Sequence, residues 1–323
     1  MIDQILPNLF RIEVPLPDNP LKALNSYLMK GDGRFLMVDT GMNRAECKQA
    51  MFSGLKELGV DLSRTDFFIT HLHADHSGMV ADLATPTSTI YFNVPEAAMR
   101  RDRERRWQEF YGFYLSHGFP EDQLKISMEN HPGRKYGLRD DVDFHVLKEG
   151  DALSIGDYCF SCIETPGHTP GHMCLYEGSK KVLLSGDHIL FDITPNITYW
   201  LEMENPLKQY LESLEKVYPL DVSLTLPGHR NRLNNHRKRI RELQEHHRLR
   251  LGEAMKALEH GEKSAFEVAP YITWDVVYRT WEEFPIRQKW FAVGETMAHL
   301  RYLEKDGRIR AMEHDGRITY SLA

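Results

Sequence analysis

The first 230 residues alternate short apolar runs with segments whose apolar residues recur at helical spacing. The runs at 35–38, 66–70 and 88–95 are short, apolar and bounded by turn residues, which is typical of buried strands. Between the first two runs, residues 44–59 place Met51, Leu55 and Leu58 on one helical stripe. Because strands and helices alternate in this way, we expect α/β layers, with helices packed on sheets.

The strand pattern returns further along the chain. Residues 143–190 contain several strand-like runs separated by glycines, and residues 205–219 place Leu207, Leu211 and Leu214 on one helix face. A short strand ending in a loop is predicted at 221–229. We therefore predict one large domain, the catalytic domain, over residues 1–235.

A helical insertion is predicted at about 95–140, between two strands. Within it Trp107, Phe110, Tyr111 and Tyr114 follow the spacing i, i+3, i+4, i+7, so they share one helix face. One interpretation is a lid that lends Trp107, Tyr111 and Tyr114 to a substrate pocket. The alternative is an amphipathic helix whose aromatic side chains pack on the core. The sequence leaves both open.

From about residue 236 the pattern becomes helical and polar. Three helical segments precede a two-stranded ribbon with Asp315-Gly316 at its turn, so residues 236–323 have the outline of a small winged-helix-like domain. From residue 241 onward this tail has 13 Lys and Arg against 14 Asp and Glu, a net charge of −1. That balance argues against nucleic-acid binding and favours a packing role or a homodimer contact.

The composition narrows the class of protein. Hydrophobic residues make up 41% of the chain and the net charge is −7, as in a globular protein without a broad basic surface. We see no signal peptide and no membrane-spanning run, and the four cysteines are expected to be reduced core residues. The CxxC spacing of Cys159 and Cys162 lies in an apolar strand-like run, which disfavours a zinc or redox role. A cytoplasmic protein is expected.

The strongest chemical signal is a cluster of histidines and aspartates directly after a predicted buried strand. Its members are His71, His73, Asp75 and His76, and imidazole and carboxylate groups suit Zn²⁺ and its first-row neighbours. Four ligands so close cannot all serve one tetrahedral ion, so they divide between two. Further ligands are expected from three later segments with a glycine beside or near a candidate ligand: 165–168, 185–188 and 227–229. Asp39-Thr40-Gly41 is a similar segment earlier in the chain.

These residues resemble the HxHxDH pattern of the metallo-β-lactamase superfamily, and the resemblance covers roughly residues 1–230, in the branch of glyoxalase II and related thioesterases. It implies an αββα sandwich of two mixed sheets covered by helices. It also implies that the first metal is held by His71, His73 and His168, the second by Asp75, His76 and His229, and that Asp187 bridges both. Asp39 would then orient a ligand rather than bind a metal.

Two further histidines, His172 and His188, lie in or next to these segments. His172 is interpreted as a structural residue that orients a ligand, with a direct ligand role as the alternative. His188 follows Asp187 directly, so it either points away from the metals or lines the substrate pocket.

The expected cofactors are two divalent ions, Zn²⁺ first, with Mn²⁺ and Fe²⁺ as alternatives. Two such ions lower the pKa of a shared water, and a bridging hydroxide oriented by Asp75 would then attack the substrate while the ions stabilise the oxyanion. The substrate we expect is a small acyl thioester of the coenzyme A or glutathione type. Arginines at the start of the insertion would meet a coenzyme A phosphate or form a solvated helix face: Arg100, Arg101, Arg103, Arg105 and Arg106.

Two other hydrolase classes remain open. Lactonases of this fold place a tyrosine three residues beyond the bridging aspartate, whereas this chain has Leu190 there. RNA-cleaving members of the superfamily carry a similar winged-helix-like tail, but the tail of this chain is not basic.

Overall fold

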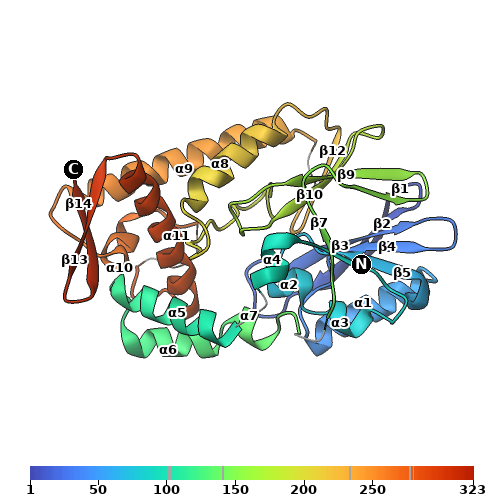
Figure 1. The fold of residues 1–323 in the computed structure, drawn as a ribbon, viewed down its shortest axis with the longest axis horizontal. Helices are drawn as coiled ribbons and strands as arrows, with labels where there is room; N and C mark the ends of the chain where they lie inside the picture. The colour runs from blue at the N-terminus through green and yellow to red at the C-terminus, as the bar shows by residue number, and fades with distance from the viewer. Residues whose placement is uncertain (100–102, 140–141, 233, 276–277, 279) are drawn as a thin grey trace.

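The computed structural model describes residues 1–323 except 100–102, 140–141, 233, 276–277 and 279. Two mixed sheets face each other at one end of the molecule, and the C-terminal helices and hairpin extend from the other end (Figure 1). This arrangement confirms the predicted αββα architecture with a small C-terminal domain.

The first sheet has seven strands in sequence order. They are β1 (Ile2–Leu6), β2 (Leu9–Pro15), β3 (Ala23–Lys30), β4 (Phe35–Val38), β5 (Thr65–Phe68), β6 (Ile90–Asn93) and β7 (His145–Leu147). The pairs from β1 to β4 are antiparallel, and those from β4 to β7 are parallel. The parallel pairs require crossover connections, which the intervening helices supply.

The second sheet has five strands in the order β12-β11-β10-β9-β8. Their bounds are β8 (Ala152–Ile155), β9 (Tyr158–Glu164), β10 (Met173–Glu177), β11 (Val182–Gly186) and β12 (Leu224–Pro227). Only β11 and β12 are parallel neighbours. Because β9 and β11 are both antiparallel to β10, β9, β11 and β12 all end at the same edge of this sheet.

Strands that are buried on both faces explain the continuous apolar runs of the sequence. Along β5, Phe67 points to the core beneath the outer helices and Phe68 points between the sheets; along β11, Leu183 and Leu184 divide in the same way. All four side chains have an exposed fraction of 1% or less. The middle layer is therefore a dry sheet-to-sheet interface.

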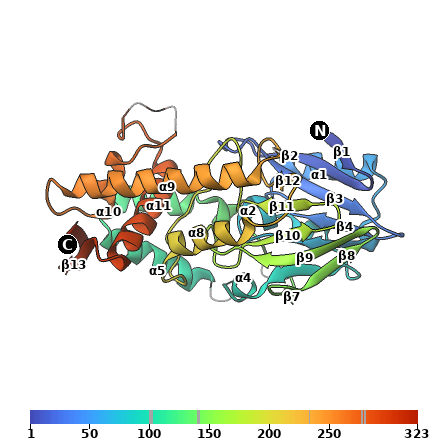
Figure 2. The same ribbon diagram turned by 90° about the horizontal axis from the view of Figure 1, so that it is seen from above.

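Helices cover the outer face of each sheet (Figures 1 and 2). On the first sheet lie α1 (Ala45–Glu57), which confirms the predicted helix at 44–59, and the short α2 (Ala74–Ser77) and α3 (Val80–Leu83). On the second lie α8 (Pro206–Val217) and the long α9 (His236–Leu258). Both α8 and α9 begin at an asparagine, Asn205 or Asn235, whose side chain accepts a backbone N–H of the first turn.

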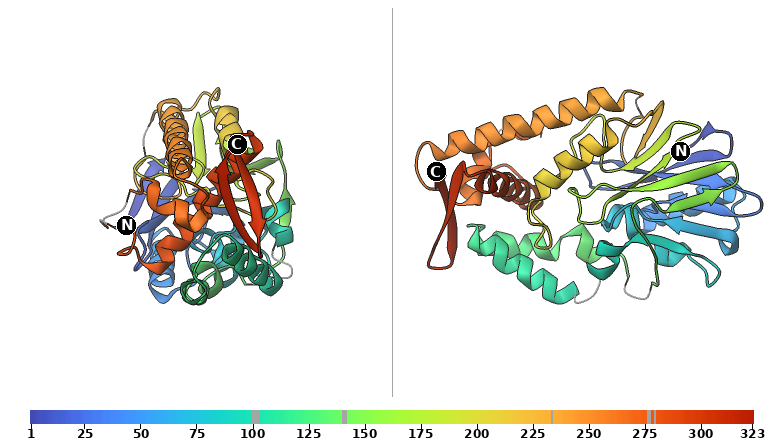
Figure 3. Two further views of the ribbon diagram at one scale, coloured as in Figure 1. Left: turned by 90° about the vertical axis from the view of Figure 1, so that its left-hand side faces the viewer. Right: turned by 45° about the horizontal axis from the view of Figure 1, so that its top comes forward.

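Between β6 and β7, the described residues form α4 (Val94–Met99), α5 (Arg103–Ser116), α6 (Glu121–Glu129) and α7 (Pro132–Lys135). The C-terminal elements are α10 (Ala265–Val268), α11 (Ile286–Lys305), β13 (Ile309–His314) and β14 (Arg317–Leu322), with 3-10 turns at 62–64 and 269–271. Asp315 and Gly316 both have positive φ at the turn of this hairpin, as the sequence predicts. Helix α11 packs against α6, α8, α9 and α10, so it joins the insertion to the C-terminal domain (Figure 3).

The expectation that all four cysteines are core residues is wrong for Cys159. Cys159 is exposed, whereas Cys47, Cys162 and Cys174 are buried. Burial also raises the pKa of the Cys162 thiol to about 12. The two members of the CxxC pair lie on opposite faces of β9, because they are an odd number of residues apart on a strand.

Candidate metal centre

The metal-ligand motifs all follow strands that end at the edge where the two sheets meet α2. His71 follows β5, His168 follows β9, Asp187 follows β11 and His229 follows β12. Helix α2 carries Asp75 and His76. Parallel strand ends meet at one sheet edge, and this brings together residues that are more than 150 positions apart in the sequence.

Three histidine nitrogens form the first cluster. His73 Nδ1 lies 3.0 Å from His71 Nε2 and 3.0 Å from His168 Nε2. Two ligand atoms bound to one tetrahedral zinc ion at about 2.0–2.2 Å lie about 3.3–3.6 Å apart. The three nitrogens therefore have the spacing and the donor type of one metal site.

A second cluster contains Asp75, His76 and His229. The two Nε2 atoms of His76 and His229 are 3.2 Å apart, and Asp75 Oδ2 lies 3.4 Å from His229 Nε2. Asp187 lies between the clusters: its Oδ2 is 3.5 Å from His229 Nε2 and 3.7 Å from His168 Nε2. Its Oδ1 is buried and lies 3.5 Å from His76 Nε2, at the distance expected of two groups that share one cation.

Electrostatics differ between the two clusters. Burial lowers the pKa of His73 to about 3 and also lowers the pKa of His71 and His168, so the first cluster presents neutral imidazoles. Burial also opposes the charging of His229, but the Asp187 carboxylate outweighs it and raises the pKa to about 9. The second cluster thus combines imidazoles with carboxylates that attract positive charge.

Each ligand histidine except His73 uses its other ring nitrogen in a hydrogen bond that fixes the ring. His71 Nδ1 lies 2.9 Å from Thr70 Oγ1, and His76 Nδ1 lies 2.7 Å from Asp39 Oδ2. The Nδ1 atoms of His168 and His229 donate to the backbone carbonyls of Asn196 and Ala23, both at 2.8 Å. Such contacts set the tautomer and the orientation of metal-binding imidazoles.

Asp39 occupies a strained turn at the end of β4. Its φ is +58°, in the left-handed region, and both its oxygens receive hydrogen bonds from Thr70. The next residue, Thr40, donates its backbone N–H to His76 O at 2.7 Å. This turn therefore ties the end of β4 to α2, and it places Asp39 against His76 rather than among the ligand atoms.

His172 is fully buried and contacts the backbone of Asp187. Its Nε2 accepts the backbone N–H of Asp187 at 3.1 Å, and its Nδ1 lies 2.7 Å from Thr165 Oγ1. Gly186 permits this approach: its φ is +48°, and a Cβ there would lie 2.7 Å from His172 Nε2. The structure thus groups His172 with the residues that orient ligands.

The pocket residues proposed from the sequence fall in different places. Tyr114 has an exposed fraction of 1% and stacks on Trp290 at 3.9 Å, so it follows the core-packing alternative. Tyr111 donates its hydroxyl to Glu121 at 2.9 Å on the surface of the insertion. His188 is buried against Tyr210 of α8, on the helical side of the second sheet. None of these three belongs to a surface at the metal clusters.

Trp107, in contrast, lies on an aromatic surface that begins at the metal centre. The Trp200 ring stacks at 6.0 Å from the His73 ring, Phe110 lies 6.1 Å from Trp200, and Trp107 lies 6.3 Å from Phe110. We call Trp200, Phe110 and Trp107 the aromatic wall. Trp200 has no regular secondary structure and no periodic pattern around it, which is why the sequence did not single it out.

The arginines at the start of the insertion are largely occupied by protein contacts. Arg103 donates to the backbone carbonyls of Leu138 and Gly133, and Arg106 pairs with Glu202. Arg105 lies 3.7 Å from Glu109. Arg100 and Arg101 are outside the described residues. Arg103 and Arg106 therefore serve the structure rather than a phosphate.

Glu96 is a buried residue that sequence reasoning missed. It accepts hydrogen bonds from Thr169 Oγ1 and from Gly171 N, the latter at 3.0 Å, and a backbone bond links it to Leu72. Leu72 lies between His71 and His73, and Thr169 follows His168, so Glu96 joins both loops of the first cluster. Burial raises the pKa of Glu96 to about 7.

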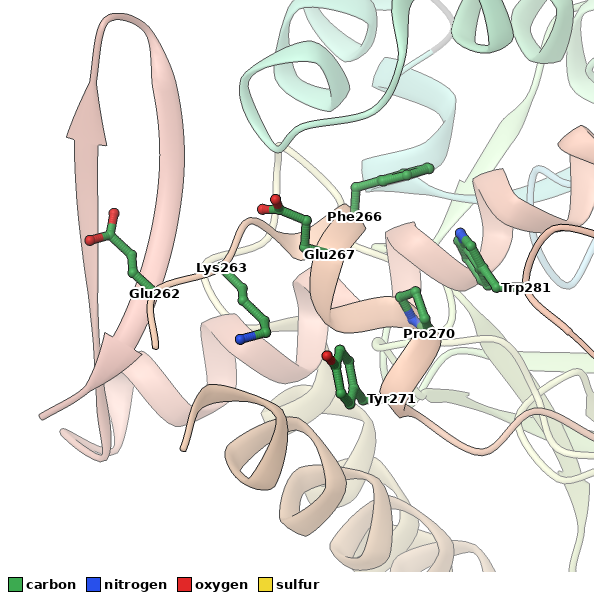
Figure 4. Close-up of a pocket in the computed structure, with 7 residues that line it drawn as sticks. All are labelled: Glu262, Lys263, Phe266, Glu267, Pro270, Tyr271 and Trp281. Atoms are coloured by element: carbon green, nitrogen blue, oxygen red, sulfur yellow. The ribbon is translucent and has the colours of Figure 1, made fainter. Parts of the chain in front are cut away.

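Two hollows lie outside the metal centre. One, of about 170 Å³, is lined by residues that include Arg44, Lys135, Tyr136 and Arg287. The other opens on the C-terminal domain around α10 and contains no metal-ligating cluster among the described residues (Figure 4). Its lining residues are Glu262, Lys263, Phe266, Glu267, Pro270, Tyr271 and Trp281.

No helix in the described part of the chain combines the length and the apolar composition needed to cross a bilayer.

Comparison with known proteins gives one family for both parts of the chain. Residues 21–229 match the model of the metallo-beta-lactamase superfamily, and residues 251–323 match that of the metallo-beta-lactamase-like C-terminal domain. The crystal structure of metallo-beta-lactamase family protein TTHA1429 from Thermus thermophilus is 29% identical, covers 99% of this chain and 100% of that one, and superposes with a TM-score of 0.84.

Curated relatives are more distant. The probable metallo-hydrolase YqjP of Bacillus subtilis is 25% identical over 88% of both chains. The acyl-coenzyme A thioesterase MBLAC2 of Homo sapiens is 25% identical over 64% of this chain and 73% of that protein. The chain spans 66% of the length of the lactamase-like fungal proteins that it matches over 267 residues.

Proposed function

Because this chain belongs to the metallo-beta-lactamase superfamily and carries its His and Asp metal-binding cluster, we propose that it is a binuclear hydrolase of small acyl thioesters. The observation that carries this proposal is the position of Asp187, with one oxygen near a ligand nitrogen of each cluster. Two divalent cations bound there would activate water and polarise a carbonyl group.

The protein's own residues supply the geometry for this chemistry. Asp187 is shared between the clusters, and His172 fixes its backbone. Asp75, beside His229, is the second carboxylate at the centre and would orient the attacking water as well as bind a metal. Neither step needs a serine or cysteine nucleophile. Zn²⁺ is the ion we propose, because the donors are five imidazoles and two carboxylates.

The aromatic wall supports an acyl substrate. It runs outward from His73, and Phe110 and Trp107 are only partly buried, so an acyl chain can be placed against them. At the Trp107 end of the aromatic wall, the His131 ring lies 4.9 Å from the Trp107 ring. Burial and the charge of Arg287 lower the pKa of His131 to about 4, which places that arginine near the wall.

A thioester carrier would extend toward the basic hollow at Arg44, Lys135 and Arg287. Three cations in one hollow suit an anionic group such as a phosphate. Each also donates to the protein: Arg44 to Pro17 O and Glu46, Lys135 to Asn130 Oδ1 and Arg287 to Asp18 O. Asp18 also lines it, with its carboxylate 3.7 Å from Arg44, and reduces the positive charge. The printed function of MBLAC2, an acyl-coenzyme A thioesterase, agrees with a carrier of this kind. We therefore propose acyl-coenzyme A over glutathione thioesters.

The test is thiol release from matched acyl thioesters of coenzyme A, glutathione and N-acetylcysteamine by the metal-loaded protein. Asp187→Asn serves as the blank. We expect turnover with coenzyme A thioesters and a higher KM for the two carriers without phosphates, glutathione and N-acetylcysteamine. Lys135→Gln should raise KM for coenzyme A thioesters but not for the other two carriers. Lys125→Gln, at an exposed position of α6, should leave KM unchanged for all three carriers. No thiol release from any carrier would overturn the proposal.

Lactones and RNA are weaker candidates. Leu190 is buried, with an exposed fraction of 1%, and offers no hydroxyl at the position where lactonases place a tyrosine. The C-terminal region from residue 241 has a net charge of −1, which does not suit a phosphate backbone.

A further inference from the structure

We propose that the C-terminal domain positions the metal ligand His168 through a buried polar relay formed by Asn196, Glu295 and Arg250. This inference rests on the metal centre of the proposed function but is independent of the substrate.

The relay begins at the ligand itself. His168 Nε2 belongs to the first cluster, and His168 Nδ1 donates to Asn196 O at 2.8 Å. Asn196 lies in the irregular segment 192–205, between β11 and α8, so no helix or sheet ladder holds its carbonyl in place. Something outside the segment must fix the direction in which this carbonyl points.

That support comes from α11. The side chain of Asn196 donates to Glu295 Oε2 at 2.7 Å, and Glu295 has an exposed fraction of only 3%. A second bond runs from Asn196 Nδ2 to Phe291 O at 3.4 Å. The backbone carbonyl and the amide of Asn196 thus face opposite ways, one toward His168 and the other toward the C-terminal domain.

A buried ion pair holds the far end of the relay. Arg250 of α9 pairs with Glu295 Oε1, and both side chains are more than nine-tenths buried. The guanidinium also donates to Thr273 O at 3.3 Å and lies over the Trp274 ring at 4.5 Å. Because Glu295 is held by Arg250 and by Asn196, its carboxylate is fixed on both sides. His246 and His247 lie close to Glu295 and with it resemble a further metal site, separate from the two clusters. However, the Glu295 carboxylate is already paired with the Arg250 guanidinium.

The same segment touches α11 again at Gly294. Tyr199 donates its backbone N–H to Gly294 O at 3.0 Å, and a Cβ on Gly294 would lie 2.2 Å from Thr198 Oγ1 and 2.4 Å from the Tyr114 hydroxyl. Alanine would normally stabilise a helix interior relative to glycine. Here the glycine is needed for the close approach of the segment to the helix.

A third contact fastens the segment to the ligand loop. Trp200 Nε1 donates to His168 O at 2.9 Å. His168 is therefore held through its ring by Asn196 and through its backbone by Trp200, and both residues belong to a segment that α11 supports. The C-terminal domain reaches the first cluster in this way, although none of the ligand residues named above belongs to it.

The experiment is a stepwise metal titration of the full-length protein against a chelator, with Zn²⁺ for affinity and Co²⁺ for its visible spectrum. Asn196→Ala keeps the backbone carbonyl but removes its link to Glu295. We expect the affinity of one of the two sites to fall about 10- to 100-fold, since that is the usual loss when a group orienting a metal ligand is removed. The other site should keep its affinity.

Three further variants separate positioning from general stability. Gly294→Ala should reproduce the one-site loss by displacing the segment, and Glu295→Gln should do so by breaking the buried pair. Glu304→Gln, on α11 but paired with Arg301 away from the relay, should leave both affinities unchanged. The ¹⁵N shifts of His168 should show altered tautomer populations in Asn196→Ala, Gly294→Ala and Glu295→Gln but not in Glu304→Gln.

Unchanged affinities at both sites in a folded Asn196→Ala protein, relative to the unsubstituted protein, would overturn the proposal. So would a loss of the same size at both sites, because a structural role would weaken the whole centre. Neither outcome depends on turnover, so the proposal and the thioesterase assignment can fail separately.

Discussion

The two halves of the metal centre are built from similar residues but are supported from different parts of the molecule. His76 and His229 are oriented by Asp39 and by the carbonyl of Ala23, both in the first sheet or at its edge. His168 of the first cluster is oriented by Asn196, in an irregular segment that rests on α11. The sheets thus fix one half, and the C-terminal domain helps to fix the other.

The two halves also differ in charge. Burial leaves the histidines of the first cluster neutral, whereas Asp187 and Asp75 raise the proton affinity of His229. A cation entering the second cluster displaces protons that these carboxylates attract. We therefore expect the second site to fill with greater dependence on pH, and the first to depend more on the geometry of its loops.

The largest effect should come from the residue that both halves share. Asp187→Asn removes a charge that lies near ligand nitrogens of both clusters, so metal occupancy should fall at both and kcat/KM should drop by on the order of 10³-fold. Metal content by mass spectrometry and thiol-release kinetics measure the two effects. Full activity in this variant would show that Asp187 does not bridge the clusters.

The next effect separates the halves. Asp39→Asn weakens the bond to His76 Nδ1, so the affinity of the second site should fall about 10- to 100-fold. In the same stepwise titration, Asn196→Ala should weaken the other site instead. If both variants weakened the same site, the division of support between the sheets and the C-terminal domain would be wrong.

The aromatic wall adjoins only the first cluster, through the contact of Trp200 with His73. Phe110→Ala removes an apolar ring from this wall, and kcat/KM for a long acyl chain should fall about 10-fold, which corresponds to about 1.5 kcal/mol of lost apolar contact. Activity on an acetyl thioester should change little. Tyr111→Phe, on the same helix but bonded to Glu121, is the matched control. An equal loss of kcat/KM for acetyl and long-chain substrates would show that the aromatic wall does not contact the acyl chain.

The last prediction concerns the stability of the metal-free protein and Glu96, which joins the loops of the first cluster. Its pKa is about 7 in the folded protein, above the value of about 4.3 in an unfolded chain, so the folded state binds more protons between these values. The free energy of unfolding of the metal-free protein should therefore decrease as pH rises from about 5 to about 7. Glu96→Gln should remove on the order of 1–3 kcal/mol of this decrease between about pH 5 and about pH 7. Chemical denaturation at several pH values measures it, and an unchanged slope would contradict the assignment.

The sequence predicted the parts of the centre that follow strands. His71, His168, Asp187 and His229 each follow a short apolar run, and such runs can be recognised because both faces of the strand are buried. It also predicted the helical insertion and the C-terminal hairpin, since periodicity and an Asp-Gly turn are local signals. The sequence left the contacts of Tyr111, Tyr114 and His188 open. Helical spacing shows that Tyr111 and Tyr114 share a face but not what that face contacts, and the position of His188 after Asp187 does not show which way its side chain points.

By itself, therefore, the sequence supplied the donor residues and the alternation of strands and helices, because residue type and periodicity are properties of neighbouring residues. The two-sheet sandwich and the division of the donors between two metals were implied by the resemblance to the metallo-β-lactamase superfamily. Only the tertiary structure decided what holds those donors in place. Asn196, Trp200 and Glu96 have no motif and no periodic pattern, and Glu295 is one carboxylate on a long helix. Their roles arise from contacts such as Asn196 with Glu295, which are 99 positions apart in the chain. Burial gives these contacts their strength, because a buried polar group must find its partner within the folded protein.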